Sequence, residues 1–174
     1  ISKNNYTDTA DQGDDYLCSI CYERGIDDLI YVVDVLYTQK PMEDTEPMTA
    51  LMLERNGTTL SRIESNNGGK GFARAVRRLV SGASIRWFHQ SNNKESRILT
   101  NAPLVTDKII MPFDWQLRFP EFYRDTIKYK RLFKANKHDD SPDTLTGIVE
   151  KEINKRSCLL YTSDAADDMQ CVDI

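Results

Sequence analysis

Three acidic residues, far apart in the chain, stand where their side chains could do chemistry. Asp8 lies in the first predicted strand, Glu64 ends the fourth, and Asp143 begins the last long predicted helix. Because each is placed where an element begins or ends, the carboxylates could meet at one edge of a sheet. Oxygen ligands of this kind suit hard divalent cations such as Mg²⁺ and Mn²⁺. Two such ions can stabilise the attacking and the leaving oxygen when a phosphodiester bond is cleaved.

The third acidic position has competitors nearby. Asp139 and Asp140 lie within one helical turn of Asp143. We favour Asp143, because it begins the helix proper, where packing fixes its geometry, and Asp140 is the substitute. His138 is a candidate to support a metal ligand or to contact phosphate, but a lone exposed histidine is more often incidental. The acids before the second strand, Asp11, Asp14 and Asp15, are expected to be solvated turn residues, with Asp15 as a candidate support for the site.

The elements that position these acids follow an α/β layered pattern. Alternating side chains and intervening turn residues predict three sequential antiparallel strands, at residues 4–10, 16–24 and 29–37. Hydrophobic periodicity then predicts further helices and strands. The helices are expected at residues 47–56, 70–80, 93–101, 120–135 and 143–155, and the strands at 58–64, 84–88 and 108–111.

Cys18 and Cys21 have the C-x-x-C spacing of a zinc or redox motif. We reject that interpretation, because residues three apart in a strand point to opposite faces of the sheet. The pair is expected to provide one core thiol and one surface thiol.

Composition indicates one soluble domain with a sizeable core: 174 residues, 40% apolar and 29% charged. No segment is long and apolar enough to predict a membrane span. Residues 158–174 resemble a translated sequencing adapter, so we expect the domain to be residues 1–157 and the rest to be a non-native tail. That tail carries four of the 27 acids and none of the 23 lysines and arginines, so residues 1–157 have 23 acids against 23 basic residues and are formally neutral. The acidic pI then no longer argues against a nucleic-acid partner.

Three motifs in register resemble one known family. They are Thr7-Asp8-Thr9-Ala10 followed by Gly13-Asp14-Asp15-Tyr16, Arg62-Ile63-Glu64-Ser65-Asn66-Asn67-Gly68-Gly69, and His138-Asp139-Asp140-Ser141-Pro142-Asp143-Thr144-Leu145. Over about residues 3 to 155 the chain resembles the C-terminal nuclease domain of tailed-phage terminase large subunits. The resemblance implies a ribonuclease-H-like fold: a mixed sheet, with its first three strands antiparallel, flanked by helices.

The resemblance also implies a function. Asp8, Glu64 and Asp143, with Asp140 as the alternative, would bind two Mg²⁺ or Mn²⁺ ions that cut concatemeric viral DNA during packaging. The implied partners are double-stranded DNA, an ATPase motor domain, the terminase small subunit and the portal, in the host cell cytoplasm and without a membrane. No G-x-x-x-x-G-K-[ST] motif occurs in the chain, so it is not expected to be the motor itself.

Basic residues on two predicted helices are candidates for contact with the DNA backbone. They are Lys70, Arg74, Arg77, Arg78, Lys128 and Arg131. Lys70 follows a glycine-rich loop at a helix start, where backbone N–H groups favour phosphate. A solvated helix face is the alternative for each of these residues.

Two alternative functions stay open on the sequence. One is a junction resolvase or integrase-like nuclease of the same superfamily. The other is a catalytically inactive DNA-binding or assembly module.

Overall fold

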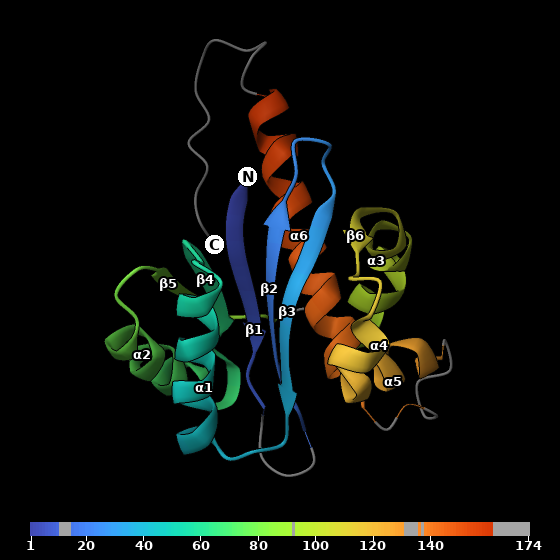
Figure 1. Ribbon diagram of the computed structural model, residues 1–174. Helices are drawn as coiled ribbons and strands as arrows, with labels where there is room; N and C mark the ends of the chain where they lie inside the picture. Colours follow the sequence, from blue (N-terminus) through green and yellow to red (C-terminus); the bar gives the residue numbers. More distant parts are fainter. Residues whose placement is uncertain (11–14, 92, 131–135, 137, 162–174) are drawn as a thin grey trace.

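A computed structural model of the chain describes residues 1–10, 15–91, 93–130, 136 and 138–161 (Figure 1). Its centre is a six-stranded sheet with the order β5-β4-β1-β2-β3-β6. The strands are β1 (Ser2–Asp8), β2 (Leu17–Arg24), β3 (Ile30–Thr38), β4 (Leu60–Glu64), β5 (Ser84–Phe88) and β6 (Ile109–Ile110). The first three are antiparallel, whereas β4 is parallel to β1, β5 to β4 and β6 to β3. The predicted mixed sheet is confirmed.

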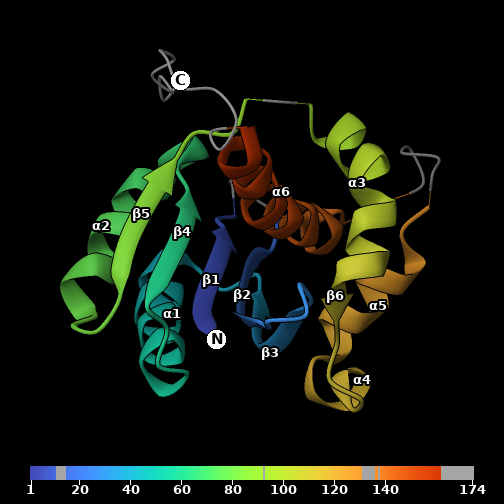
Figure 2. The same cartoon turned by 90° about the horizontal axis from the view of Figure 1, so that it is seen from above.

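Helices cover both faces of this sheet, as Figures 1 and 2 show. They are α1 (Met42–Arg55), α2 (Gly69–Leu79), α3 (Lys94–Lys108), α4 (Trp115–Arg118), α5 (Pro120–Lys128) and α6 (Asp140–Tyr161), with a short 3-10 turn, η1 (Asn66–Gly68). The helices α1 and α2 pack on one face of the sheet, and α5 and α6 on the other. The chain therefore forms a three-layer sandwich of helix, sheet and helix.

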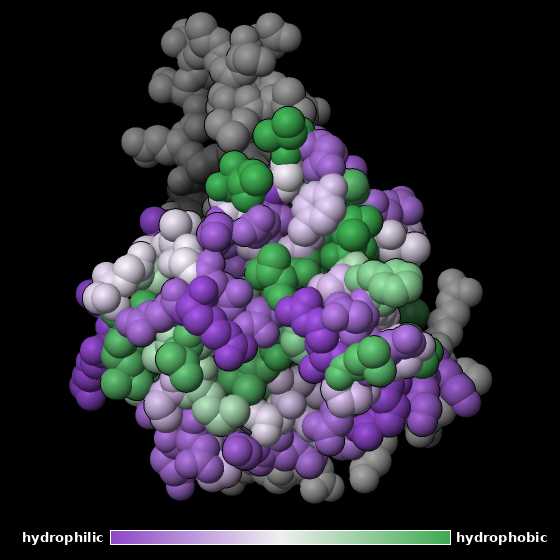
Figure 3. Space-filling model, in the orientation of Figure 1, coloured by the Kyte–Doolittle hydropathy of each residue, from purple (hydrophilic) through white to green (hydrophobic). Residues whose placement is uncertain are grey.

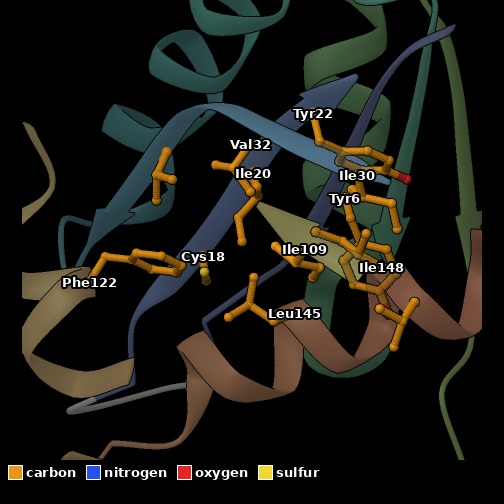
Figure 4. Close-up of a cluster of buried hydrophobic side chains, with 12 residues drawn as sticks. Tyr6, Cys18, Ile20, Tyr22, Ile30, Val32, Ile109, Phe122, Leu145 and Ile148 are labelled. Carbon is orange, nitrogen blue, oxygen red and sulfur yellow. The ribbon is translucent and has the colours of Figure 1, made fainter. Parts of the chain in front are cut away.

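Each face of the sheet has its own hydrophobic core. Alternation along a strand sends neighbouring residues to opposite faces. Tyr6 of β1 packs toward α6, whereas Ile63 of β4, which is paired with the next residue of β1, packs toward α2. Figure 4 shows the core on the α6 side. That core contains Tyr6, Cys18, Ile20, Tyr22, Ile30, Val32, Val35, Ile109, Phe122, Leu145, Ile148 and Val149.

The two cysteines of the C-x-x-C pair do lie on opposite faces of the sheet. Cys18 belongs to the core on the α6 side and Cys21 to the core on the α1 and α2 side. Both are free and buried, so the expected surface thiol is wrong. The reason is that helices cover both faces, which leaves no solvent-facing side for a central strand such as β2.

Several helix boundaries differ from the prediction. The helix α1 begins at Met42 and continues through Pro47, which lies inside the helix, and Glu43 and Asp44 in the first turn favour the N-terminal end of the helix dipole. Similarly, α3 continues through Pro103 to Lys108. In contrast, α5 ends at Lys128, because the backbone of Tyr129 is extended.

The last helix starts earlier than expected. Its first residue is Asp140, and the Asp143 N–H already donates to the Asp139 carbonyl at 3.1 Å. The helix continues to Tyr161, across the predicted boundary after residue 157, and residues 162–174 lie outside the described part of the chain. The proposed non-native tail therefore stays a prediction.

The surface seen in the orientation of Figure 1 interleaves hydrophilic and hydrophobic residues, as Figure 3 shows. Within the described ranges, no helix has both the length and the apolar character needed to cross a bilayer.

Candidate metal centre

Asp8 and Glu64 meet because β1 and β4 are neighbouring parallel strands. Thr7 is paired with Ile63, so the next residue of each strand, Asp8 and Glu64, lies at the same C-terminal edge. Strand alternation places both side chains on the face covered by α6, since Tyr6 and Arg62 also point there. Adjacent strands are about 4.8 Å apart, which brings the two carboxylates into the same small volume.

The loop after Glu64 closes tightly over this edge. A Cβ atom at Gly69 would overlap the Glu64 carbonyl oxygen and the Thr9 hydroxyl, so only glycine lets α2 begin this close to the strand ends. Gly68, with φ of 98°, makes the preceding left-handed turn. Asn66 joins the loop to the end of β5 by two hydrogen bonds with the backbone of Gln90.

The first turn of α6 brings further carboxylates to the same place. Asp140 and Asp143 are 6% and 4% exposed. The Tyr16 backbone N–H donates to Asp140 Oδ2 at 3.0 Å, which ties the helix start to the beginning of β2. Since both acids belong to the helix, helix geometry does not favour Asp143 over Asp140 as the third ligand.

One pocket of about 200 Å³ collects these side chains. The residues that line it are Asp8, Thr9, Asp15, Glu64, Asn66, Gln90, Lys94, Arg97, Asp140 and Asp143. It therefore includes the three predicted acids, the substitute Asp140 and also Asp15. Asp139 and His138 are not among the lining residues, and His138 instead packs edge-on against the ring of Tyr16 at 5.0 Å. Asp11 and Asp14 lie outside the described residues.

Two cations that were not predicted from the sequence lie among the acids. Lys94 Nζ is 2.7 Å from Asp139 Oδ1, 3.0 Å from Asp140 Oδ1 and 3.7 Å from Asp143 Oδ2. Arg97 Nη1 donates to Asp143 Oδ1 at 3.0 Å, and its Nη2 pairs with Glu150 at 2.9 Å. Both cations lie in the first turns of α3. Their spacing of three residues on one helix face, shortly after a strand parallel to β4, is the signal that could have found them.

The pKa values of the pocket residues reflect burial first and neighbouring charge second. Burial, followed by the charge of Glu64, raises the pKa of Asp8 well above its usual value. Burial also raises the pKa of Asp143 to about 6, although Lys94 and Arg97 oppose the shift. Burial alone would lower the pKa of the Lys94 ammonium, but the surrounding carboxylates, led by Asp140, raise it above its usual value.

A buried tyrosine forms a hydrogen bond with Glu64. The Tyr6 hydroxyl donates to Glu64 Oε1 at 2.5 Å. Burial, and then the charge of Glu64, raises the pKa of Tyr6 well above its usual value, so the hydroxyl keeps its proton and remains a donor.

The donor chemistry of the pocket fits a divalent cation. Its acids offer hard carboxylate oxygens, and burial is the main cause of the raised pKa values of Asp8 and Asp143, so a bound cation would favour the ionised form of both side chains. As the side chains stand, no three His, Cys, Asp or Glu residues in the described part of the chain are gathered tightly enough to hold one metal ion. Lys94 lies among the acids of α6 instead.

The predicted DNA-contacting residues fall on two helices. Four of them lie on α2 and are exposed: Lys70, Arg74, Arg77 and Arg78. Lys128 is exposed at the end of α5. Figures 1 and 2 place these helices on opposite sides of the molecule, with β1 and α6 between them. Arg131 lies outside the described residues.

Comparison with known proteins places the fold. No protein-family model and no curated protein matches the sequence significantly. The nuclease domain of the large terminase subunit gp2 of bacterial virus Sf6 matches with a TM-score of 0.57 and 11% identity, over 87% of this chain and 88% of that chain. A mutant of that domain, solved with manganese and beta-thujaplicinol, matches equally well. The yeast mitochondrial Holliday junction resolvase Ydc2 has a TM-score of 0.44 and 8% identity, over 92% of this chain and 86% of that chain.

The fold is identified by the sheet order and the first of these comparisons. The chain has the ribonuclease-H-like fold, in the form seen in the terminase nuclease domain.

Proposed function

We propose that this chain is a metal-dependent endonuclease that hydrolyses phosphodiester bonds of double-stranded DNA. The observation that carries the proposal is the meeting of Asp8, Glu64, Asp140 and Asp143 around one pocket at the C-terminal edge of β1 and β4. Its support is the fold, shared with a terminase nuclease domain that was solved with manganese.

The acids would hold the ions, Mg²⁺ or Mn²⁺, and the neighbouring side chains would set their positions. When bound, a pair of such ions supplies a water of lowered pKa and stabilises the leaving oxygen. Tyr6 holds Glu64, the Tyr16 N–H holds Asp140, and Arg97 holds Asp143. Lys94 now supplies positive charge among the acids, so metal binding requires its ammonium to move away from Asp140 and Asp143.

The biological setting proposed for this activity is the packaging of viral DNA. In that setting the chain would cut concatemeric DNA as part of a terminase large subunit, in the host cell cytoplasm. An ATPase motor domain, a small subunit and a portal would decide where and when it cuts. The basic residues of α2 and Lys128 of α5 would contact the DNA backbone without reading its sequence.

A nicking assay on supercoiled plasmid tests the proposal. The wild-type chain should convert the plasmid to open circles with Mn²⁺ and leave it intact with EDTA. Asp8→Asn and Glu64→Gln should remove this activity, because each deletes a charged oxygen ligand. Asp114→Asn is the matched control, since Asp114 is an exposed acid paired only loosely with Arg118, outside the pocket.

Full nicking by Asp8→Asn, or nicking that persists in EDTA, contradicts the proposal. DNA binding by the wild-type chain without any cleavage would instead identify the inactive binding or assembly module.

A further inference from the structure

Tyr6 occupies an unusual place for an aromatic core residue. Its side chain is fully buried between the sheet and α6, among the residues shown in Figure 4. Two residues further along the same strand face lies Asp8, and the Tyr6 hydroxyl donates to Glu64 on the neighbouring strand. The ring therefore lies directly beneath the acid pocket.

The helix that faces Tyr6 has no side chain at the point of contact. A Cβ atom at Gly147 would overlap both the Cζ and the hydroxyl oxygen of Tyr6. The ring of Tyr6 therefore fills the space that a side chain at position 147 would occupy. Gly147 lies four residues after Asp143, one turn along α6 and on the same face of the helix.

These contacts connect one side chain to carboxylates on two different elements. The hydroxyl of Tyr6 fixes the position of Glu64 through a hydrogen bond. The ring fixes how closely α6 approaches the sheet one turn from Asp143. A phenylalanine would keep the ring in the core but could not orient Glu64, so the hydroxyl is the part of the side chain that acts on the pocket.

We propose that Tyr6 is a positioning residue, which sets the spacing between Glu64 and Asp143 through its hydroxyl and its contact with Gly147. This inference rests on the proposed metal-dependent function. Hydrogen-bond partners of metal ligands commonly contribute roughly 10- to 100-fold to metal affinity. Removing the Tyr6 hydroxyl should therefore weaken metal binding without emptying the core.

The experiment compares Tyr6→Phe with Tyr22→Phe by calorimetric titration with Mn²⁺, in the absence of DNA. Tyr22 is a matched control, because it is equally buried on the same sheet face and its hydroxyl donates at 2.8 Å to Glu152, a buried acid of α6 outside the pocket. The Tyr22 hydroxyl also accepts a hydrogen bond from Arg62 at 3.1 Å, which Tyr22→Phe removes as well. Each variant loses one hydrogen bond to a buried carboxylate. Only Tyr6→Phe should lower Mn²⁺ affinity, by about tenfold or more.

Gly147→Ala is a second variant for the same titration, and it keeps the Tyr6 hydroxyl. The added methyl group displaces the Tyr6 ring, so Mn²⁺ affinity should fall here as well. A Tyr6→Phe variant that binds Mn²⁺ like the wild type overturns the inference. So does a Tyr6→Phe variant that fails to fold while Tyr22→Phe folds, since the hydroxyl would then act in stability. If the wild-type chain takes up no Mn²⁺, the proposed function fails, and this inference fails with it.

Discussion

Asp143→Asn should make the metal-free protein more stable, although it removes a side chain with two cationic neighbours. The pKa of Asp143 is about 6, whereas an unfolded aspartate has a pKa of about 3.9. Burial is the main cause of this increase, and it exceeds the opposing effect of Lys94 and Arg97. A shift of about two units corresponds to about 3 kcal/mol that the ionised carboxylate costs the folded state.

The sign of the pH dependence follows from the direction of the shift. Since the folded pKa is raised, the cost is fully present above about pH 6 and disappears as the pH falls from 6 toward 4. At pH 8 we expect Asp143→Asn to raise the free energy of unfolding by about 3 kcal/mol, or the melting temperature by about 6–12 °C for a chain of this size. Near pH 4 the two proteins should be equally stable.

Urea unfolding in EDTA at both pH values measures this difference. Asp114→Asn, at an exposed position, should change the free energy of unfolding by less than about 0.5 kcal/mol at either pH. A decrease of about 1 kcal/mol or more for Asp143→Asn at pH 8 would refute the reasoning. It would mean that Asp143 stabilises the fold through its ion pair with Arg97, and that its ionised carboxylate does not destabilise the folded state.

Two further predictions concern the cations. Lys94→Met should lower the stability of the metal-free protein by about 1–3 kcal/mol, because the acids of α6 lose their shared cation. Added Mn²⁺ should then raise the melting temperature of this variant more than that of the wild type. Equal increases in melting temperature would show that Lys94 and the metal do not compete. Replacing Arg74, Arg77 and Arg78 with alanine should weaken duplex binding, measured by fluorescence anisotropy. The slope of the logarithm of the binding constant against the logarithm of salt concentration should become less steep by about 0.9 for each phosphate that the protein no longer neutralises. An unchanged slope would show that these arginines face solvent and do not contact DNA.

The sequence predicted the mixed sheet and the position of Asp8 and Glu64 at strand ends, for a physical reason. Strand alternation and turn residues identify β1 to β4, and the position of an acid at a strand end is visible without knowing the partner strand. The pairing of β1 with β4 in parallel then brings Asp8 and Glu64 together. The start of the last predicted helix indicated the third position, Asp143, and the structure places Asp140 and Asp143 in the pocket together.

The cations and the supporting tyrosine could not be predicted in the same way. The roles of Lys94 and Arg97 depend on how α3 packs against α6, and their three-residue spacing on one helix face does not by itself reveal this contact between distant segments. The second buried thiol, Cys21, was missed for a related reason, since burial on both faces depends on the helices that cover the sheet. Tyr6 resembles any core aromatic residue until Glu64 is placed above it.

The proposed metal centre can be tested by a crystal structure of the wild-type chain grown with MnCl₂, with data collected at the manganese absorption edge. We expect two anomalous peaks in the pocket between Asp8, Glu64 and the first turn of α6, with the Lys94 ammonium displaced from Asp140. An ordered pocket that keeps the Lys94 ion pairs and shows no anomalous peak at saturating Mn²⁺ would rule out the metal centre.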